Sequence, residues 1–332
     1  MHRGTASLGG PCRGPRSTHR VAGLWGEGHP PRRGTGSRPV RVAGLGGGHG
    51  LAATLAAARS YADDIRAVVT VADDGGSSGR LTRELGIPPP GDIRNCLVAL
   101  AENEEIADLF QHRFDSGALT GHTVGNLVIA ALTERSGDFA EAVAEAGRLL
   151  RCAGRVFPAT TALVDLLARV EGGEIRGQVA VARSQELIQA VFLEPSKPPA
   201  CAGAVEAIMA ADQVVLGPGS LFTSLIATLL VPGIREALQR TSARRILVCN
   251  SRMQKGETDG LDAAAHVGAV MAQVGPDSLD AVVVQTPEVG SDPVTLDRDA
   301  LRHYAVEVIE ADVVKPSGEH DPGRLARVLS RL

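Results

Sequence analysis

Aromatic residues are scarce in this chain, since Phe, Trp and Tyr make up 3% of its 332 residues, whereas hydrophobic residues of all kinds make up 44%. Ala, Val and Leu must therefore fill the interior, as is usual where helices pack on a parallel sheet. A hydrophobic fraction of this size excludes a chain that is mostly disordered. The composition favours an α/β fold with enough apolar material for one large core or two modest ones.

Long apolar runs and a cysteine framework are also lacking. The longest apolar stretch, 221–234, is interrupted by Pro232 and falls short of the roughly 18 residues that cross a bilayer. No signal-peptide core is present, so we expect no membrane insertion. The five cysteines are odd in number and form no CxxC pair, which favours reduced thiols in a cytoplasm and excludes metal fingers.

Clusters of Lys and Arg are absent from most of the chain. The formal net charge is −4, and residues 1–38 carry seven Arg against the single acid Glu27. Subtracting this local +6 leaves −10 for residues 39–332, which argues against a nucleic-acid partner. Residues 1–38 are rich in Gly, Pro and Arg and show no hydrophobic period, so we predict a disordered basic tail followed by one domain over 39–332.

From Val40 onward, short β-branched runs alternate with Ala- and Leu-rich stretches at helical spacing, which is the pattern of repeated βαβ units. This predicts an α/β fold of three layers, in which helices cover both faces of a mostly parallel sheet. The expected architecture is doubly wound and Rossmann-like. Alternating residues at 174–183 and 190–193 predict a small antiparallel elaboration in mid-chain. The predicted strands are 40–44, 67–72, 213–216, 245–249, 281–285 and 305–309, and the predicted helices are 51–61, 93–103, 124–135, 139–150, 221–230 and 262–274.

The first predicted strand runs into a glycine-rich turn that contains Gly46, Gly47, Gly48 and His49. Glycine lets a ligand approach main-chain N–H groups at a helix start, where the helix dipole favours anions. The stretch 48–53 fits the G-x-G-x-x-A dinucleotide fingerprint loosely, and a Walker A motif fails for want of Lys followed by Ser or Thr. A plain tight turn is the alternative interpretation.

The second predicted strand ends in Asp73, Asp74, Gly75, Gly76 and Ser77. Paired acids at a strand's carboxyl end can hold a ribose hydroxyl or Mg²⁺, and the Gly-Gly-Ser stretch offers donors to a phosphate. Asp73 also lies some 20 residues past the glycines, where a dinucleotide site keeps its ribose acid. A solvated polar loop is the alternative.

Polar residues at two further helix starts are candidates. Asp92, Arg94 and Asn95 follow a Pro-rich turn, where Asp92 is expected as the helix N-cap and Arg94 could face a phosphate. Capping of the helix alone would also explain Asp92, and a surface ion pair would also explain Arg94. Asn126 opens an apolar helix just after His122, and its amide needs partners that a base or sugar edge could supply.

A second transition from strand through glycine to helix contains Gly217, Gly219 and Ser220. It repeats the anion-site pattern of the first turn, and both should lie at one edge of the sheet. Asn250 follows the next strand and supplies a polar group at the same edge, although an ordinary linking loop would explain it equally well.

Several stretches resemble a known family when they are taken in order. They are Gly46–Gly48, TVADDGGSSGRL at 70–81, PPGDIRNCLVALA at 89–101, GNLVIAAL at 125–132, GPGSLFTSL at 217–225 and GETDG at 256–260. Together they resemble the YvcK-type gluconeogenesis factors, relatives of the CofD phospholactate transferases. The likeness covers about residues 40–332, with three departures. His49 stands where relatives usually have Thr, Ser251-Arg252-Met253 replaces a more apolar stretch ahead of the GET motif, and Glu319 stands where Arg is expected before His320.

The resemblance implies a CofD-like fold, a cytoplasmic role in gluconeogenic growth, cell shape and cell-wall synthesis, and binding of UDP-sugars such as UDP-N-acetylglucosamine or UDP-glucose. It implies no established reaction and no catalytic residue. A CofD-like, Mg²⁺-dependent 2-phospho-L-lactate transferase and an NAD-binding oxidoreductase remain as alternatives, and a homodimer is allowed. The candidate ligand-binding residues are Gly46, Gly47, Gly48, His49, Asp73, Asp74, Gly75, Gly76, Ser77, Asp92, Arg94, Asn95, Asn126, Gly217, Gly219, Ser220 and Asn250, with Asp74 as the candidate Mg²⁺ ligand.

Overall fold

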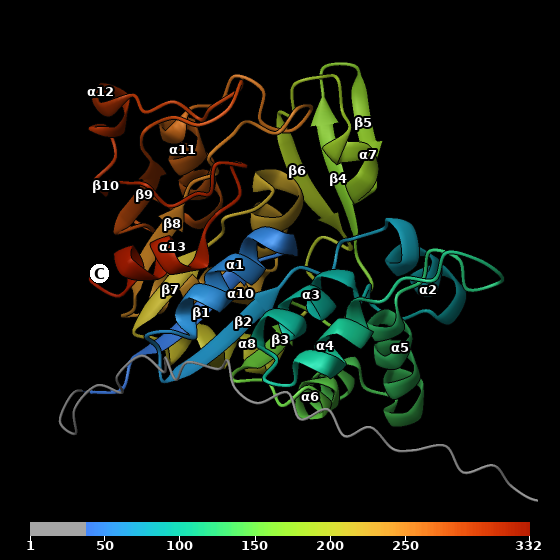
Figure 1. The fold of residues 1–332 in the computed structure, drawn as a ribbon. Coiled ribbons are helices and arrows are strands. Elements are labelled where there is room, and N and C mark those ends of the chain that lie inside the picture. Colours follow the sequence, from blue (N-terminus) through green and yellow to red (C-terminus); the bar gives the residue numbers. More distant parts are fainter. Residues whose placement is uncertain (1–37) are drawn as a thin grey trace, which may run out of the picture. The chain divides into compact units, whose positions relative to one another are not determined.

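The computed structural model describes residues 38–332, so the predicted tail lies outside the described residues except for Arg38. A seven-stranded, entirely parallel sheet forms the centre of the domain, in the order β10-β9-β8-β7-β1-β2-β3 (Figure 1). The strands of this sheet are β1 (Arg41–Gly46), β2 (Asp64–Val69), β3 (Arg155–Pro158), β7 (Gln213–Leu216), β8 (Arg244–Val248), β9 (Ala281–Gln285) and β10 (Glu307–Ala311).

The order of the strands creates a reversal next to β1. The chain runs outward from β1 through β2 to β3, then returns to β7 on the other side of β1 and runs outward again to β10. In open α/β sheets such a reversal leaves a crevice at the carboxyl ends of the two central strands, and ligands bind there. The fold therefore places its crevice where β1 and β7 end.

Helices cover both faces of the sheet and produce two separate cores. Along β2, Ala67 and Val69 face one core while Val68 faces the other, as expected for alternating side chains of a strand buried on both faces. The first core receives buried residues of α1, α3, α5, α6 and α13, and the second receives those of α8, η1, α9, α10 and α11. The predicted three-layer architecture is thus confirmed.

The helices begin and end as follows: α1 (Gly48–Ala58), α2 (Gly76–Leu85), α3 (Gly91–Leu100), α4 (Glu104–Gln111), α5 (Val124–Ser136), α6 (Phe139–Leu149), α7 (Gln178–Ala182), α8 (Ala202–Met209), the π-helical turn η1 (Leu221–Ile226), α9 (Ala227–Leu229), α10 (Pro232–Arg240), α11 (Ala263–Val274), α12 (Arg298–Leu301) and α13 (Pro322–Leu329).

The mid-chain elaboration is a three-stranded antiparallel sheet in the order β5-β4-β6, formed by β4 (Asp165–Val170), β5 (Gly173–Arg176) and β6 (Ala190–Glu194). The prediction of a single strand over 174–183 is wrong in its second half, because β5 ends at Arg176 and the helix α7 follows. After Gln178, the residues of α7 alternate between Val and Ala, and so short a stretch fits a strand and a helical turn equally well.

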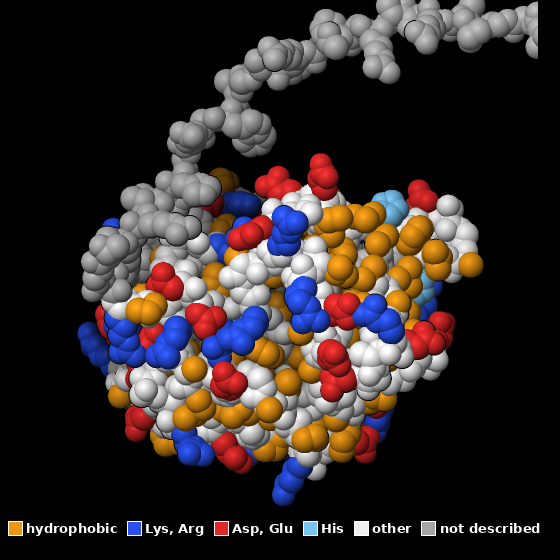
Figure 2. All heavy atoms as spheres, turned by 90° about the horizontal axis from the view of Figure 1, so that it is seen from below, with side chains coloured by type: hydrophobic (Ala, Val, Ile, Leu, Met, Phe, Trp, Pro, Cys, Tyr) orange, Lys and Arg blue, Asp and Glu red, His pale blue; other side chains and the backbone are white. Residues whose placement is uncertain are grey.

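The surface of the domain shows no single dominant feature on the face seen in Figure 2. Cationic and anionic side chains are interspersed there, and apolar side chains gather toward one side.

Within residues 38–332, no single helix has the length and apolarity that a membrane crossing requires. One bent pair of helices, η1–α9 with α10, meets the criterion only when its two parts are joined.

Candidate functional site

The two glycine turns meet at the crevice. The turn Gly47–Gly50 follows β1 and opens α1, and the turn Gly217–Ser220 follows β7 and opens η1. A Cβ atom placed on Gly50 would lie 2.3 Å from the carbonyl oxygen of Pro218, so the two turns touch through their backbones. Only glycine permits this approach.

Two adjoining cavities flank this contact. The larger has a volume of about 630 Å³ and the smaller about 330 Å³. The residues that line both are His49, Gly50, Gly219 and Gln254, so the glycine turns form the partition between them. A ligand that spans both cavities would therefore pass directly over main-chain N–H groups at the start of α1, where the N-cap residue Gly47 has no side chain to bind them.

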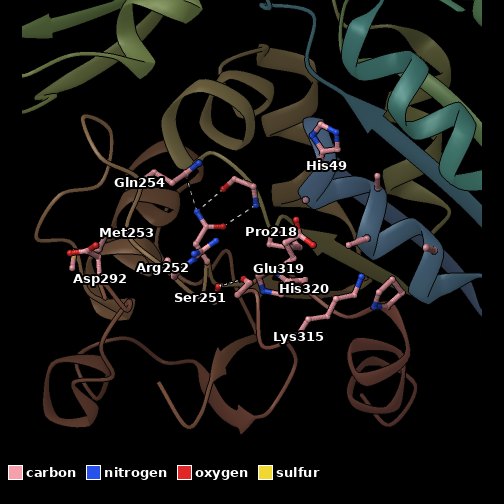
Figure 3. A pocket seen from close by; sticks show the side chains of 18 of the residues that line it. His49, Pro218, Ser251, Arg252, Met253, Gln254, Asp292, Lys315, Glu319 and His320 are labelled. Carbon is pink, nitrogen blue, oxygen red and sulfur yellow. Dashed lines mark hydrogen bonds between the residues drawn. The ribbon is translucent and has the colours of Figure 1, made fainter. Parts of the chain in front are cut away.

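The larger cavity combines an apolar wall with charged side chains, as Figure 3 illustrates. Small side chains of α1, Ala52, Ala53 and Ala56, form one wall. The segments 250–254, 291–292 and 315–322 supply the rest, including the cations Arg252 and Lys315 and the acids Asp292 and Glu319. Such a mixture of a flat apolar wall and a few polar groups is typical of sites for organic ligands.

His320 also lines the larger cavity. Burial lowers its pKa to about 4, against the opposing effect of a hydrogen bond with the backbone of Cys249. The imidazole is therefore neutral near pH 7, and its Nε2 is a buried atom without a hydrogen-bond partner among the described residues.

The smaller cavity contains two carboxylates, Asp73 and Asp92. Burial, and then the negative charge of Asp73, raises the pKa of Asp92 to about 7, although a hydrogen bond from the Gly48 backbone amide and the charge of Arg94 act in the opposite direction. Burial also raises the pKa of Asp73. Asp92 is not the N-cap that the sequence led us to expect: Pro90 holds that position, and Asp92 lies in the first turn of α3 facing the cavity.

Asp73 and Asp92 fit Mg²⁺ better than they fit a metal that needs many protein ligands. Within residues 38–332 there is no group of three or more His, Cys, Asp or Glu side chains that could hold a metal ion. Mg²⁺ usually keeps several waters and takes one or two carboxylates together with substrate phosphates. Burial raises the pKa of both carboxyl groups, and the charge of Asp73 adds to the effect at Asp92, so a cation beside Asp92 would favour its ionised form.

Asp74, the predicted Mg²⁺ ligand, lies elsewhere. Its Oδ1 accepts a hydrogen bond of 2.9 Å from the backbone amide of Val179 in α7, and a Cβ atom on Gly177 would lie 2.2 Å from its Oδ2. Asp74 therefore docks the antiparallel elaboration onto the main domain. This docking brings Gln178 into the smaller cavity.

A buried polar cluster accounts for several other predicted residues. Ser77 Oγ lies 3.0 Å from His122 Nδ1 and accepts a hydrogen bond of 3.0 Å from Asn126. Arg94 donates to Thr123 Oγ1 and to Asn95 Oδ1, at 2.6 and 2.7 Å. These side chains join α2, α3 and α5 to one another, and none of them lines either of the two cavities.

The structure thus divides the predicted ligand-binding residues into two groups. Those that line a cavity are Gly47, Gly48, His49, Asp73, Asp92, Gly219, Ser220 and Asn250. Those that line neither cavity are Gly46, Asp74, Gly75, Gly76, Ser77, Arg94, Asn95, Asn126 and Gly217. Sequence reasoning missed Thr70, Thr223 and Ser224, which lie inside quoted motifs and could have been singled out, and also Gln178, Arg252, Gln254, Asp292 and Lys315, which carry no motif signal.

Comparison with known proteins shows the family of this chain. The model of the 2-phospho-L-lactate transferase CofD family matches residues 42–314. A relative from Mycobacterium tuberculosis strain H37Rv is 47% identical over 307 residues, covering 87% of this chain and 89% of the relative. The gluconeogenesis factor of Bacillus subtilis strain 168 is 40% identical over 314 residues, covering 90% of this chain and 99% of that protein.

A solved structure is also similar. The crystal structure of a UPF0052 family member from Bacillus halodurans superposes with a TM-score of 0.85 at 38% identity, covering 89% of this chain and 99% of that chain. The family match, the identity to curated relatives and the shared architecture all cover most of the chain. The chain therefore belongs to the CofD family, and within it to the gluconeogenesis factors of the YvcK and UPF0052 group.

Proposed function

We propose that this chain binds a nucleotide sugar, UDP-N-acetylglucosamine or UDP-glucose, and acts as a cytoplasmic regulator of gluconeogenic growth, cell shape and cell-wall synthesis. The observation that carries the proposal is the backbone contact between Gly50 and Pro218, which sets two glycine turns between two cavities at the switch point of the sheet. The names of the curated relatives support the link to gluconeogenesis.

The two cavities suit the two ends of such a ligand. The larger one, with its alanine wall and the polar side chains of residues 250–254, suits a uracil and ribose. The smaller one, with Thr70, Gln178 and Ser224 beside the two acids, suits a sugar rich in hydroxyls. The diphosphate would then lie over the turns, near His49 and Gly50 at the start of α1 and within reach of Lys315 or Arg252.

Calorimetry with UDP-N-acetylglucosamine and UDP-glucose tests this function, with NAD as the comparison ligand. We expect saturable binding of a UDP-sugar with a dissociation constant below about 100 µM, equivalent to about −5.5 kcal/mol. Absence of heat at millimolar concentrations of both sugars would count against the proposal. Preferential binding of NAD would favour the oxidoreductase alternative instead.

A second candidate function is a Mg²⁺-dependent phospholactate transfer, and the Asp73–Asp92 pair favours it. These carboxylates would hold Mg²⁺, which supplies charge neutralisation at a phosphate during its displacement. Incubation with the deazaflavin acceptor and the activated phospholactate donor tests this reaction. Turnover that is lost in Asp92→Asn supports it, and an inert parent protein excludes it.

A further inference from the structure

Glu257 is a buried carboxylate that lies at the second glycine turn and is 5% exposed. Within residues 38–332 it forms no ion pair, and its partners are all neutral donors. Its Oε1 accepts hydrogen bonds from the backbone amides of Phe222 and Thr223, at 2.7 and 2.9 Å, and the Thr223 hydroxyl lies 3.3 Å from both carboxylate oxygens.

These amides belong to the first turn of η1, where a helix ordinarily receives an external anion. Glu257 occupies that place. The expectation that the second turn offers its helix amides to a ligand phosphate is therefore not met at Phe222 and Thr223, because an internal anion already binds them. The groups of this turn that face the cavities are Gly219 and Ser220 instead.

Two more side chains of the same segment hold the turn. Asn250 accepts from the Gly219 amide at 3.0 Å and donates to the Gly219 carbonyl oxygen at 2.8 Å. Gln254 donates to Ser220 Oγ at 3.0 Å and accepts from Asn250 at 3.0 Å. Residues 250–257 therefore bind the turn at Gly219, at Ser220 and at the start of η1. Asn250 and Gln254 line the cavities themselves, whereas Glu257 lines neither of them.

We propose that Glu257 is a positioning residue for the ligand: by filling the start of η1 with its own carboxylate, it holds Gly219 and Ser220 in their binding position. The proposal rests on the proposed function. Loss of the carboxylate would leave two buried amides without an anionic acceptor, and the first turn of η1 would relax toward the cavities. Ligand affinity would fall even though Glu257 itself touches no ligand.

The test compares Glu257→Gln, which keeps the size of the side chain, with Asp259→Asn as a matched control. Asp259 is exposed on the same turn, and its carboxylate binds the Gly256 amide rather than residues 217–224. Affinity for UDP-N-acetylglucosamine is measured by calorimetry well below the unfolding temperature of each variant, and hydrogen exchange is followed in peptides over 217–225 of the free proteins.

We expect Glu257→Gln to weaken binding by about tenfold or more, equivalent to about 1.4 kcal/mol, and to speed exchange at 219–223. Asp259→Asn should bind within about twofold of the parent, which is well under 1 kcal/mol. A merely structural role would lower the unfolding temperature and leave the affinity unchanged. Parent-like affinity in Glu257→Gln therefore overturns the proposal.

Two further outcomes remain decisive. If Glu257→Gln does not fold, Glu257→Asp replaces it, since it keeps the charge but shortens its reach; the same loss of affinity is expected, and parent-like binding contradicts the proposal. If the parent protein binds no UDP-sugar, the proposed function fails and hydrogen exchange of the free proteins tests the positioning role alone. Faster exchange at 219–223 in Glu257→Gln, but not in Asp259→Asn, supports that role. Equal exchange in the parent and Glu257→Gln overturns it.

Discussion

At the scale of single residues, Gly50 is the point at which the two turns touch. Gly50→Ala would place a methyl group 2.3 Å from the Pro218 carbonyl oxygen, and backbone must move to accept it. We expect a loss of about 1–3 kcal/mol in unfolding free energy together with weaker ligand binding, because overpacking forces the turns apart. Denaturant unfolding and calorimetry measure the two effects.

The matched control is Gly147→Ala, in the last turn of α6, where the added methyl group would meet Leu97 at an ordinary 3.4 Å. Alanine is the better helix former, so this variant should equal or exceed the parent in stability by up to about 1 kcal/mol. Equal stability of the two variants would show that the turns are not in tight contact.

Glu319 brings a negative charge to the cavity proposed for an anionic ligand. Glu319→Arg should tighten binding of UDP-N-acetylglucosamine by several-fold, since the reversal of one charge near a phosphate is worth about 1 kcal/mol in a partly hydrated site. Ser317→Arg, an exposed position on the same segment, controls for the change in net charge. A similar gain in both variants would mean that general attraction, rather than the cavity, is responsible.

Asp92 and Asp74 have different environments, and this difference is testable. Asp92→Asn should reduce Mg²⁺ affinity by about tenfold or more, because it removes one of the two carboxylates that could hold the ion. Asp74→Asn should retain Mg²⁺ affinity and instead loosen α7, whose Val179 amide the carboxylate binds. Titration with MgCl₂ and hydrogen exchange over 177–183 measure the two effects; loss of Mg²⁺ binding in Asp74→Asn alone would reverse the assignment.

At the scale of elements, six strands of the main sheet were predictable because each is a short apolar run that ends in a turn signal. The predicted 40–44 and 213–216, for example, correspond to β1 and β7. β3 was missed because its four residues, RVFP, begin with Arg and end with Pro, so that only two apolar residues, Val156 and Phe157, precede the Pro. α2 was missed because it opens with Gly-Ser-Ser-Gly, which is typical of a loop. The hydrogen bond from Asn126 of α5 to Ser77 is a tertiary contact that favours the helix and that the sequence does not reveal.

The candidate site was predictable to the same degree and for related reasons. Topology places the ends of β1, β2 and β7 at one edge, so Gly47, Asp73 and Gly219 could be assigned to one cleft in advance. Sequence could not tell which polar side chains turn inward: Ser77 and Asn126 bind each other rather than the cavity. Nor could it place residues such as Lys315, because long-range packing alone brings that segment to α1.

At the scale of the whole molecule, stability should depend on buried neutral histidines. The pKa of His320 is lowered to about 4, below its ordinary 6.5, and burial also lowers that of His266. A depressed folded-state pKa means that protonation favours unfolding, so this contribution is complete above about pH 6.5 and is lost as the pH falls toward 4. The unfolding free energy should therefore fall by about 3 kcal/mol over that range because of His320, and His266 should act in the same direction.

His320→Asn should flatten this dependence, and denaturant unfolding between pH 7 and pH 4 measures it. Asp92 acts in the opposite sense: its raised pKa of about 7 adds stability as the pH falls, so the parent and the variant must be compared directly. An unchanged pH dependence in His320→Asn would show that the imidazole is not buried in solution.

A crystal structure of the protein with UDP-N-acetylglucosamine tests the central claim most directly. The account predicts a diphosphate over the contact between the two glycine turns, within hydrogen-bond distance of the His49 or Gly50 amide and beside Gly219, with the uracil against the alanine wall of α1. A diphosphate bound away from both turns, or a ligand held only at the buried cluster of Ser77 and Asn126, would contradict it.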